Sequence, residues 1–178
     1  TGAFTLQTVA PGGEVIDEVS VGHAVVSPSK LGFASVAPSG AFTAGAAASL
    51  TVSLTTSNPL DAGSSVSLLF PPSFNLSDLC YHSPGAPASS CAPGGPITAT
   101  GAGLASSAVS VAGRNASVHL AAAVPAETAL SFTLAGVKAP PTSGLTGAYT
   151  IVTRNSLGVT IDADFAVPPP PVDAGDLM

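Results

Sequence analysis

Two cysteines are the residues of this sequence whose type and spacing predict a covalent link. Cys80 and Cys91 are the only cysteines, and the ten residues between them are rich in Pro, Ser and Gly. In a loop-rich secreted chain, such a pair predicts one disulfide. Closing so short a loop would stabilise the fold by roughly 2–3 kcal/mol. The spacing fits no zinc pattern, and His82 alone does not complete a four-ligand site, so unpaired thiols are the alternative.

Two asparagines are predicted sites of covalent modification. Asn75-Leu76-Ser77 and Asn115-Ala116-Ser117 are both N-glycosylation sequons. Each lies where a loop or turn is predicted, so a glycan attached to Asn75 or Asn115 would be exposed. Such triplets also arise by chance in Ser-rich chains, and an ordinary asparagine in a turn is the alternative at both positions.

Acidic residues near the end of the sequence raise the question of a cation site. Asp162 and Asp164 lie two residues apart on one face of a predicted strand, and Asp17 and Glu18 occupy a similar place near the start. Calcium takes six to eight oxygen ligands and therefore needs a denser cluster of acids. A solvated strand face is the favoured interpretation, and no metal or other cofactor is predicted.

The three histidines form no recognisable catalytic constellation. His23, His82 and His119 lie among many serines, but the sequence has no Gly-x-Ser-x-Gly elbow, and nothing places a base beside a nucleophile. His119 alternates with Val118 and Leu120, which predicts an outward-facing strand residue. The glycine-rich pieces lack the downstream helix pattern that phosphate and dinucleotide sites require. The sequence therefore predicts that the protein is not an enzyme.

The composition predicts an all-β protein. Hydrophobic residues make up 46% of the 178 residues, aromatic residues 5% and charged residues 8%, and there are 19 Gly and 17 Pro. Small residues, β-branched residues and frequent turns favour strands over helices. So few charges are unusual for an exposed surface, which indicates that much of the surface is buried in an assembly or that glycans supply solubility.

The charge balance argues against two classes of partner. The net charge is −6, and the four basic residues are scattered singly: Lys30, Arg114, Lys138 and Arg154. Nucleic acids and anionic membrane surfaces are bound by clusters of such residues. No apolar run approaches the length of a membrane span. The sequence therefore predicts no nucleic-acid partner and no membrane span.

The elements that position these residues are organised by an internal repeat. Residues 146–167 read TGAYTIVTRNSLGVTIDADFAV, and residues 1–21 read TGAFTLQTVAPGGEVIDEVSV. Aligned without a gap at an offset of 146 − 1 = 145 residues, the two stretches are identical at eight positions, numbered 1, 2, 3, 5, 8, 13, 16 and 17 in the first. Similarity at a fixed offset is the signature of a repeat architecture. In each copy, a turn separates two alternating segments, so each is predicted to be a β-hairpin.

A hairpin of this kind needs other strands. A lone two-stranded hairpin is marginal in water unless further strands cover its apolar side. The second copy ends a run of predicted strands that can cover it, whereas nothing precedes the first. Residues 1–22 are therefore expected to complete another domain, in a tandem array or in a neighbouring molecule, through an apolar row of Phe4, Leu6 and Ile16. After Asp17 the alternation slips, which indicates a bulge or a different partner.

Between the two copies, seven to nine short strands are predicted over residues 31–167, the spacing typical of a two-sheet sandwich. The clearest strand has Ala48, Leu50, Val52 and Leu54 alternating with Ser or Thr, and Ala112-Gly113-Arg114-Asn115 is predicted to be a tight hairpin turn. Residues 23–30 are expected to be a junction. Residues 168–178 are expected to be a proline-rich tail, with a stiff spacer followed by an acidic end.

Three stretches carry a resemblance to a known family: SLTTSNPLDAGSSVSLLFPPSF, FTLAGVKAPPTSGLTGAYTIVT and the following strand with Ile-Asp. They resemble the immunoglobulin-like β-sandwich repeats of algal and microbial surface and filament glycoproteins, including fibre- or mastigoneme-like proteins. The resemblance covers roughly residues 31–167 and, again, residues 1–22. It implies an immunoglobulin-like sandwich with a structural or adhesive extracellular role, built into fibres in some relatives by strand donation.

In an algal setting, the proline run would also be open to hydroxylation and O-glycosylation at Pro168, Pro169, Pro170 and Pro171. An unmodified spacer is the favoured alternative.

The sequence thus predicts a non-enzymatic structural subunit of an extracellular glycoprotein filament or tandem-domain surface fibre, assembled by strand complementation. Its expected partners are other copies of itself or adjacent domains of a longer chain, together with attached glycans. The alternative is a cell-surface adhesin module that binds carbohydrate or protein. With no Trp and two Tyr, the chain has little aromatic surface for stacking on sugars.

Overall fold

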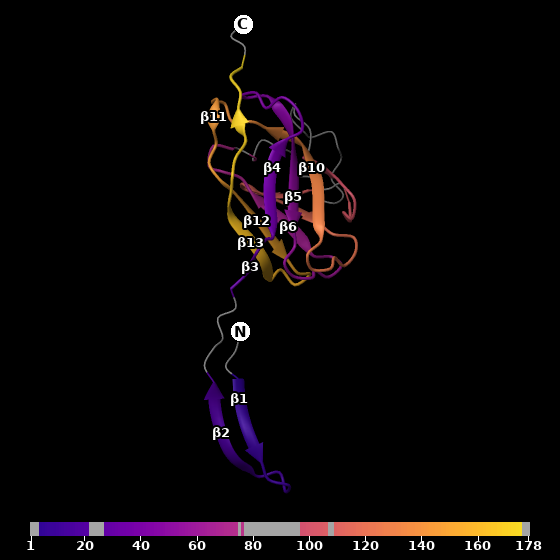
Figure 1. The fold of residues 1–178 in the computed structure, drawn as a ribbon, viewed down its shortest axis with the longest axis vertical. Helices are drawn as coiled ribbons and strands as arrows, with labels where there is room; N and C mark the ends of the chain where they lie inside the picture. The colour runs from indigo at the N-terminus through magenta and orange to yellow at the C-terminus, as the bar shows by residue number, and fades with distance from the viewer. Residues whose placement is uncertain (1–3, 22–26, 75, 77–96, 107–108, 176–178) are drawn as a thin grey trace.

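The computed structural model describes residues 4–21, 27–74, 76, 97–106 and 109–175. All regular elements of the described residues are strands, which confirms the all-β prediction. No described segment forms a helix that is long and apolar enough to cross a membrane. Figure 1 shows an amino-terminal hairpin, β1 (Phe4–Val9) and β2 (Val15–Val21), standing apart from a larger part. We call this larger part, the described residues from 27 to 175, the body.

One sheet of the body has four strands in the order β4-β5-β10-β7. Their bounds are β4 Phe33–Pro38, β5 Ala47–Thr55, β7 Thr98–Thr100 and β10 Ala129–Lys138. In β5 every second side chain is buried, beginning with Ala48 and ending with Leu54, as the alternation predicts. On the opposite face, hydroxyl groups of β5 and β10 lie within hydrogen-bonding distance, as for Ser53 and Ser131 at 3.0 Å.

The other large sheet has six strands in the order β3-β13-β12-β6-β9-β8. Their bounds are β3 Ser29–Lys30, β6 Ser65–Leu69, β8 Ser110–Ala112, β9 Asn115–His119, β12 Tyr149–Arg154 and β13 Thr160–Val167. The predicted tight turn is confirmed, because Ala112 pairs with Asn115 across the two residues Gly113 and Arg114. Gly113 has a φ of 58°, a conformation that favours glycine.

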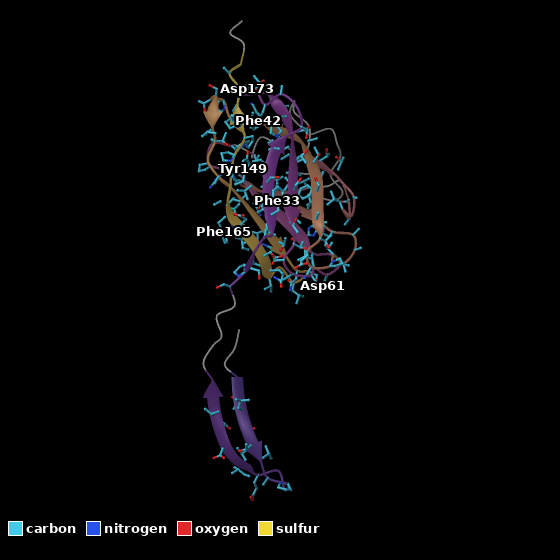
Figure 2. All side chains as sticks on the ribbon, in the orientation of Figure 1. Phe33, Phe42, Asp61, Tyr149, Phe165 and Asp173 are labelled. Atoms are coloured by element: carbon cyan, nitrogen blue, oxygen red, sulfur yellow. The ribbon has the colours of Figure 1, made fainter. Side chains whose placement is uncertain are left out.

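Residues from both large sheets form one hydrophobic core, an arrangement consistent with a β-sandwich. Its largest buried side chains include an aromatic cluster of Phe42, Phe70, Phe74 and Tyr149. The contacting rings of this cluster have centroids 5.0 to 6.3 Å apart. Figure 2 shows Phe42 and Tyr149 inside the body and Phe165 at its margin.

The proline-rich tail differs from the prediction of a spacer. Residues of the tail form β14 (Pro171–Val172), which pairs with β11 (Gly144–Leu145). Val172 is only 3% exposed and belongs to the core. The N–H of Ala44 donates to the Asp173 carbonyl at 2.9 Å, which fixes the next residue as well. The fixed φ of proline suits an extended edge segment, and the apolar Val172 provides a reason for it to pack.

The alternation along residues 159–167 predicts one apolar face made of Val159, Ile161, Ala163, Phe165 and Val167, and this prediction is wrong in part. Phe165 is 69% exposed, whereas Asp162 is fully buried. Two register shifts in the pairing of β12 with β13, one after Tyr149 and one after Val152, each place an extra residue in β13. Each such bulge interrupts the strict alternation of faces, and a bulge leaves no clear mark in the sequence.

Candidate functional site

The candidate site is the amino-terminal hairpin. β1 and β2 pair antiparallel from Phe4 with Val21 to Val9 with Val15, and they form a two-stranded sheet of their own. A register shift between Thr8 and Val9 leaves Ile16 as the extra residue of β2, so the bulge lies one residue before Asp17. Each strand is thus paired on its inner edge, whereas the outer edges of β1 and β2 pair with no other strand of the described residues.

The apolar side chains of the hairpin are exposed to an extent that is unusual for their type. Leu6 is 62% exposed, Ile16 64% and Val19 55%. Leu6 faces Val19 across the sheet, and these two residues line a hollow with Gln7, Thr8, Asp17 and Glu18. The predicted row included Phe4, whose main chain pairs with Val21 but whose side chain lies outside the described residues. Val19, opposite Leu6, is an addition that the sequence pattern did not identify.

The hairpin reproduces the bounds of β12 and the first residue of β13, and β2 ends one residue before the position that corresponds to the end of β13. At the offset of 145 residues, Phe4–Val9 corresponds to Tyr149–Arg154, and Val15 corresponds to Thr160, the first residue of β13. The repeat seen in the sequence is therefore a repeat of structure.

The pairing register and the bulge are also repeated. Gln7 pairs with Glu18, as Val152 pairs with Ala163, and Val9 pairs with Val15, as Arg154 pairs with Thr160. Both hairpins therefore have an extra residue at the same place, which is Ile16 in one copy and lies between Thr160 and Ala163 in the other. The second bulge of β13, near Val167, has no counterpart in the amino-terminal hairpin.

The turns of the two hairpins share two main-chain hydrogen bonds although their sequences differ. The N–H of Ala10 donates to the Glu14 carbonyl at 2.8 Å, as that of Asn155 donates to the Val159 carbonyl at 2.9 Å. Gly13 and Gly158 donate to the Ala10 and Asn155 carbonyls, and their φ angles are 88° and 80°. Only glycine adopts this conformation freely, which explains why the glycine is identical in the two copies.

β12 and β13 show what such a hairpin needs from its surroundings. In the body, β12 pairs with β6 on its other side, and β13 pairs in parallel with β3. Tyr149 and Ile151, which correspond to Phe4 and Leu6, are fully buried. The Tyr149 ring centroid lies 5.5 Å from that of Phe70, within the aromatic cluster. The same type of hairpin is thus buried at one end of the chain and exposed at the other.

Asp162 is the polar residue that attaches β13 to the four-stranded sheet. Its Oδ2 accepts from the main-chain N–H of Ser57 at 3.1 Å and of Asn58 at 3.3 Å, and its Oδ1 accepts from the Asn58 side-chain amide at 2.7 Å. These donors follow directly after β5. The favoured interpretation of Asp162 as part of a solvated strand face is therefore wrong, because this carboxylate is buried and satisfied by a turn.

The neighbouring Asp164 is different from Asp162. Asp164 is half-buried, and its Oδ1 accepts from the nearby Ala166 N–H at 3.0 Å. Among the described residues, no group of three or more His, Cys, Asp or Glu side chains is arranged to hold a metal ion.

Tyr149 contributes a perturbed ionisable group to the core. Burial raises the pKa of its phenol far above the ordinary value, and the neighbouring Thr146 side chain offsets only a small part of this rise. Among the described residues, neither the Tyr149 hydroxyl nor the Thr146 hydroxyl has a hydrogen-bond partner of normal geometry. The Tyr149 hydroxyl therefore has a cost in stability, and Phe4 at the corresponding position of the hairpin lacks it.

The covalent sites predicted from sequence are only partly within the described residues. Cys80, Cys91 and Asn75 lie outside them. Asn115 is half-buried and is the first residue of β9, immediately after the tight turn. The four residues of the proline run differ in exposure: Pro168 and Pro171 are exposed, Pro169 is half-buried and Pro170 is buried.

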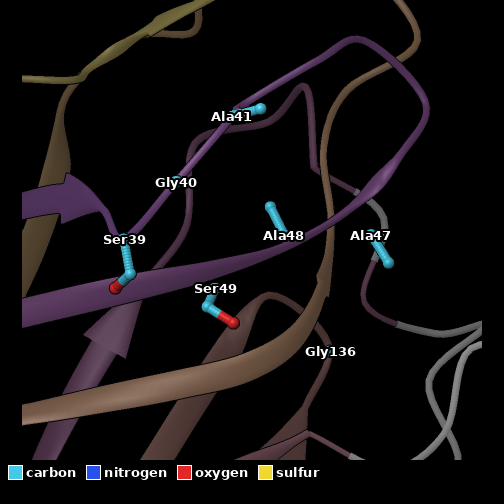
Figure 3. A pocket seen from close by; sticks show the side chains of 7 residues that line it. All are labelled: Ser39, Gly40, Ala41, Ala47, Ala48, Ser49 and Gly136. Carbon is cyan, nitrogen blue, oxygen red and sulfur yellow. The ribbon is translucent and has the colours of Figure 1, made fainter.

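A small hollow beside the turn between β4 and β5 offers no catalytic groups. Figure 3 shows its lining, which consists of small side chains: Ser39, Gly40, Ala41, Ala47, Ala48, Ser49 and Gly136. The Ser39 hydroxyl is within hydrogen-bonding distance of the Thr51 hydroxyl, at 2.7 Å, rather than beside a base. No aromatic ring lines the hollow for stacking on a sugar. His119 is exposed, and His23 and His82 lie outside the described residues.

Comparison with known proteins finds no matching family model, no matching curated protein and no matching solved structure. The function of the chain is therefore inferred from the residues and contacts described above.

Proposed function

We propose that this chain is a non-enzymatic structural module of an extracellular assembly and that it is joined to its neighbours by strand complementation. The amino-terminal hairpin is the connector. It completes another domain of the same kind, in the place that β12 and β13 occupy in the body. The observation that carries this proposal is that the hairpin repeats the bounds, register and turn of β12 and β13 while its apolar side chains are exposed.

An immunoglobulin-like topology is part of the proposal. The order β4-β5-β10-β7 matches the A-B-E-D sheet of such domains, and β13-β12-β6 matches the G-F-C strands of the other sheet. β9 and β8 extend this second sheet beyond β6, as additional strands do in variable-type domains. One departure is that β8 and β9 follow β7 in the chain, whereas variable-type domains have the corresponding strands before D.

The free energy of docking follows from what is buried at the corresponding positions of the body. Leu6 corresponds to the fully buried Ile151, so burial of Leu6 contributes roughly 1.5–3 kcal/mol. Ile16 and Val19 correspond to the half-buried Ile161 and Asp164 and contribute less. The outer edge of β1 gains main-chain hydrogen bonds, since β12 pairs with β6 over five residue pairs. Ordering of the linker and side chains opposes these terms.

The proposal of an extracellular location rests on residues that form disulfides or carry glycans in secreted proteins. The predicted Cys80–Cys91 disulfide and the two sequons at Asn75 and Asn115 are of this kind. Charged residues make up only 8% of the chain, which suits a surface covered by neighbouring domains or glycans. The alternative of a carbohydrate-binding adhesin lacks a corresponding feature, because the hollow beside β4 has no aromatic lining.

A tandem chain tests the proposal. Residues 27–145, which lack a closing hairpin, are joined directly to residue 1 of the full 178-residue chain, so that residues 1–22 follow residue 145 as residues 146–167 do. Residues 1–22 occur once in this tandem chain, and their amide hydrogen exchange is therefore read without ambiguity. We expect the amides of β1 and β2 to be protected in the tandem chain and to exchange freely in the unfused chain. Equal exchange in both would overturn the proposal.

The first unit of the tandem chain could fail to fold for a reason unrelated to the hairpin. A second variant therefore tests the hairpin within the full chain. In the full chain, residues 146–166 are replaced by residues 1–21 at the same offset, which keeps β14 in place against the body. Cooperative thermal unfolding of this chain is the expected result. Position 163 needs a matched form, because the buried Ala163 would become glutamate. A second form retains alanine at position 163. It shows whether the rest of the hairpin sequence can close the domain without the cost of a buried glutamate. If neither form folds, the hairpin cannot close such a domain.

A further inference from the structure

Asp17 is the residue of the hairpin whose counterpart makes the most specific polar contacts in the body. At the offset of 145 residues, Asp17 corresponds to Asp162, and Thr8 corresponds to Thr153; both residue types are identical in the two copies. Asp162 is fully buried, whereas Asp17 is exposed. The two copies thus share an aspartate at a position that is buried in the body. This requires an explanation, because burial of a carboxylate without hydrogen-bond partners is costly.

The contacts of the two aspartates differ in a consistent way. In the body, the Thr153 hydroxyl bonds to the main chain of Asp162, accepting from its N–H at 3.0 Å and lying 3.4 Å from its carbonyl. This leaves the Asp162 carboxylate for Ser57 and Asn58. In the free hairpin, the Thr8 hydroxyl instead donates to the Asp17 carboxylate, at 3.2 Å from Oδ2. In the free hairpin, the Asp17 carboxylate is thus hydrogen-bonded to Thr8 and not to a turn such as the one that contains Ser57 and Asn58.

We propose that Asp17 determines the register and the partner specificity of docking: its carboxylate accepts hydrogen bonds from the turn that follows the second strand of the four-stranded sheet in the acceptor domain. This inference rests on the proposed function. The acceptor is a domain of the same fold that lacks its own closing hairpin. Its turn presents two successive main-chain N–H groups and a side-chain amide, as Ser57 and Asn58 do in the body. A slip of the hairpin by one residue moves the carboxylate to the other face of the strand and leaves these donors unpaired.

Glu18 provides the matched control for Asp17. It corresponds to Ala163, so docking as in the body does not use its carboxylate. In the free hairpin, Glu18 accepts from the Gln7 side-chain amide at 2.5 Å. Because Ala163 is buried in the body, docking of the hairpin onto residues 27–145 brings Glu18 to a buried position, where its charge opposes docking.

The experiment uses the tandem chain and the hydrogen exchange of residues 1–22. Asp17→Asn is expected to accelerate exchange of the β1 and β2 amides by roughly ten- to a hundredfold, the range for hydrogen bonds to a charged group. Glu18→Gln is expected to leave this exchange unchanged or to slow it. In the unfused chain, Asp17→Asn is expected to leave the thermal unfolding of the body unchanged.

The direct contact is tested by a double-mutant cycle. Asn58→Ala in the first unit of the tandem chain removes the amide that Asp17 is proposed to engage, and the same substitution in the second unit is its control. The effects of Asp17→Asn and first-unit Asn58→Ala are expected to be less than additive.

Three outcomes distinguish the inference from the proposed function. Protected hairpin amides that are accelerated by Asp17→Asn support both. Protected amides that are unaffected by Asp17→Asn overturn the role of Asp17 and leave strand complementation standing. Hairpin amides that exchange freely in every tandem chain overturn both.

Discussion

Replacement of Tyr149 by phenylalanine is expected to stabilise the body. The Tyr149 side chain is fully buried, and its hydroxyl has no hydrogen-bond partner of normal geometry in the part of the chain that the structure describes. An unsatisfied buried polar group costs about 1–3 kcal/mol. The ring contacts with Phe70 and Phe74 do not involve the hydroxyl and are kept by phenylalanine. We therefore expect Tyr149→Phe to raise the free energy of unfolding by about 1 kcal/mol, which corresponds to about 2–4 °C in Tm.

The same substitution is expected to remove a dependence of stability on alkaline pH. Burial raises the pKa of Tyr149 well above that of the unfolded chain, which is about 10. Below pH 10 the phenol is protonated in both states, and its contribution does not change with pH. Above pH 10 the unfolded state loses the proton while the folded state keeps it, so stability falls by about 1.4 kcal/mol per pH unit until the folded pKa is reached.

Urea denaturation followed by far-UV circular dichroism at pH 8, 10 and 11 measures both effects. The wild-type chain and Tyr149→Phe share every other ionisable group, so the difference between their free energies of unfolding isolates Tyr149. This difference is expected to be near 1 kcal/mol at pH 8 and to grow above pH 10. A Tyr149→Phe chain that is less stable than wild type at pH 8, with a difference that is constant up to pH 11, would refute the reasoning.

Three further predictions concern the body. Asp162→Ala leaves the donors of Ser57 and Asn58 unpaired and is expected to lower the free energy of unfolding by about 1–3 kcal/mol. Asp164→Ala is expected to cost less than about 1 kcal/mol, and similar costs in urea denaturation would contradict the buried role of Asp162. Gly158→Ala forces alanine to a φ of 80° and is expected to cost about 1–2 kcal/mol, which a thermal melt can check. Cys80→Ser is expected to lower the free energy of unfolding by roughly 2–3 kcal/mol under oxidising conditions and to have no such effect under reducing conditions; equal stability of the two chains in both would exclude the disulfide.

The sequence predicts those parts of the fold in which alternation is uninterrupted. β5 is the example, because its small polar and apolar residues alternate over nine residues without a bulge. In β13, two bulges interrupt the alternation, and Phe165 and Asp162 fall on unexpected sides. A bulge depends on the pairing partner more than on the local residues, so a pattern read along one strand does not reveal it.

The candidate site, too, could be predicted only in part from the pattern along one strand, and the internal repeat supplies additional information. The repeat identified the hairpin, but Asp162 was interpreted as solvated because a carboxylate on a strand usually faces water. The identity of Asp17 and Asp162 in two copies that differ at most other positions was the available signal of a specific contact. The burial of Val172 had no comparable signal, because proline-rich tails more often remain extended spacers.

The structure also limits how the proposed strand complementation would take place. In the body, the acceptor position is already occupied by β12 and β13, and Asp162 already engages Ser57 and Asn58. A hairpin from another chain would bring Leu6 in place of Ile151 but Glu18 in place of the buried Ala163, and would therefore gain nothing by exchange. The resident hairpin is moreover held by the chain itself, at an effective concentration in the millimolar range. Intact copies are therefore not expected to exchange their closing hairpins, and the proposed connector would act on a domain whose closing strands are absent.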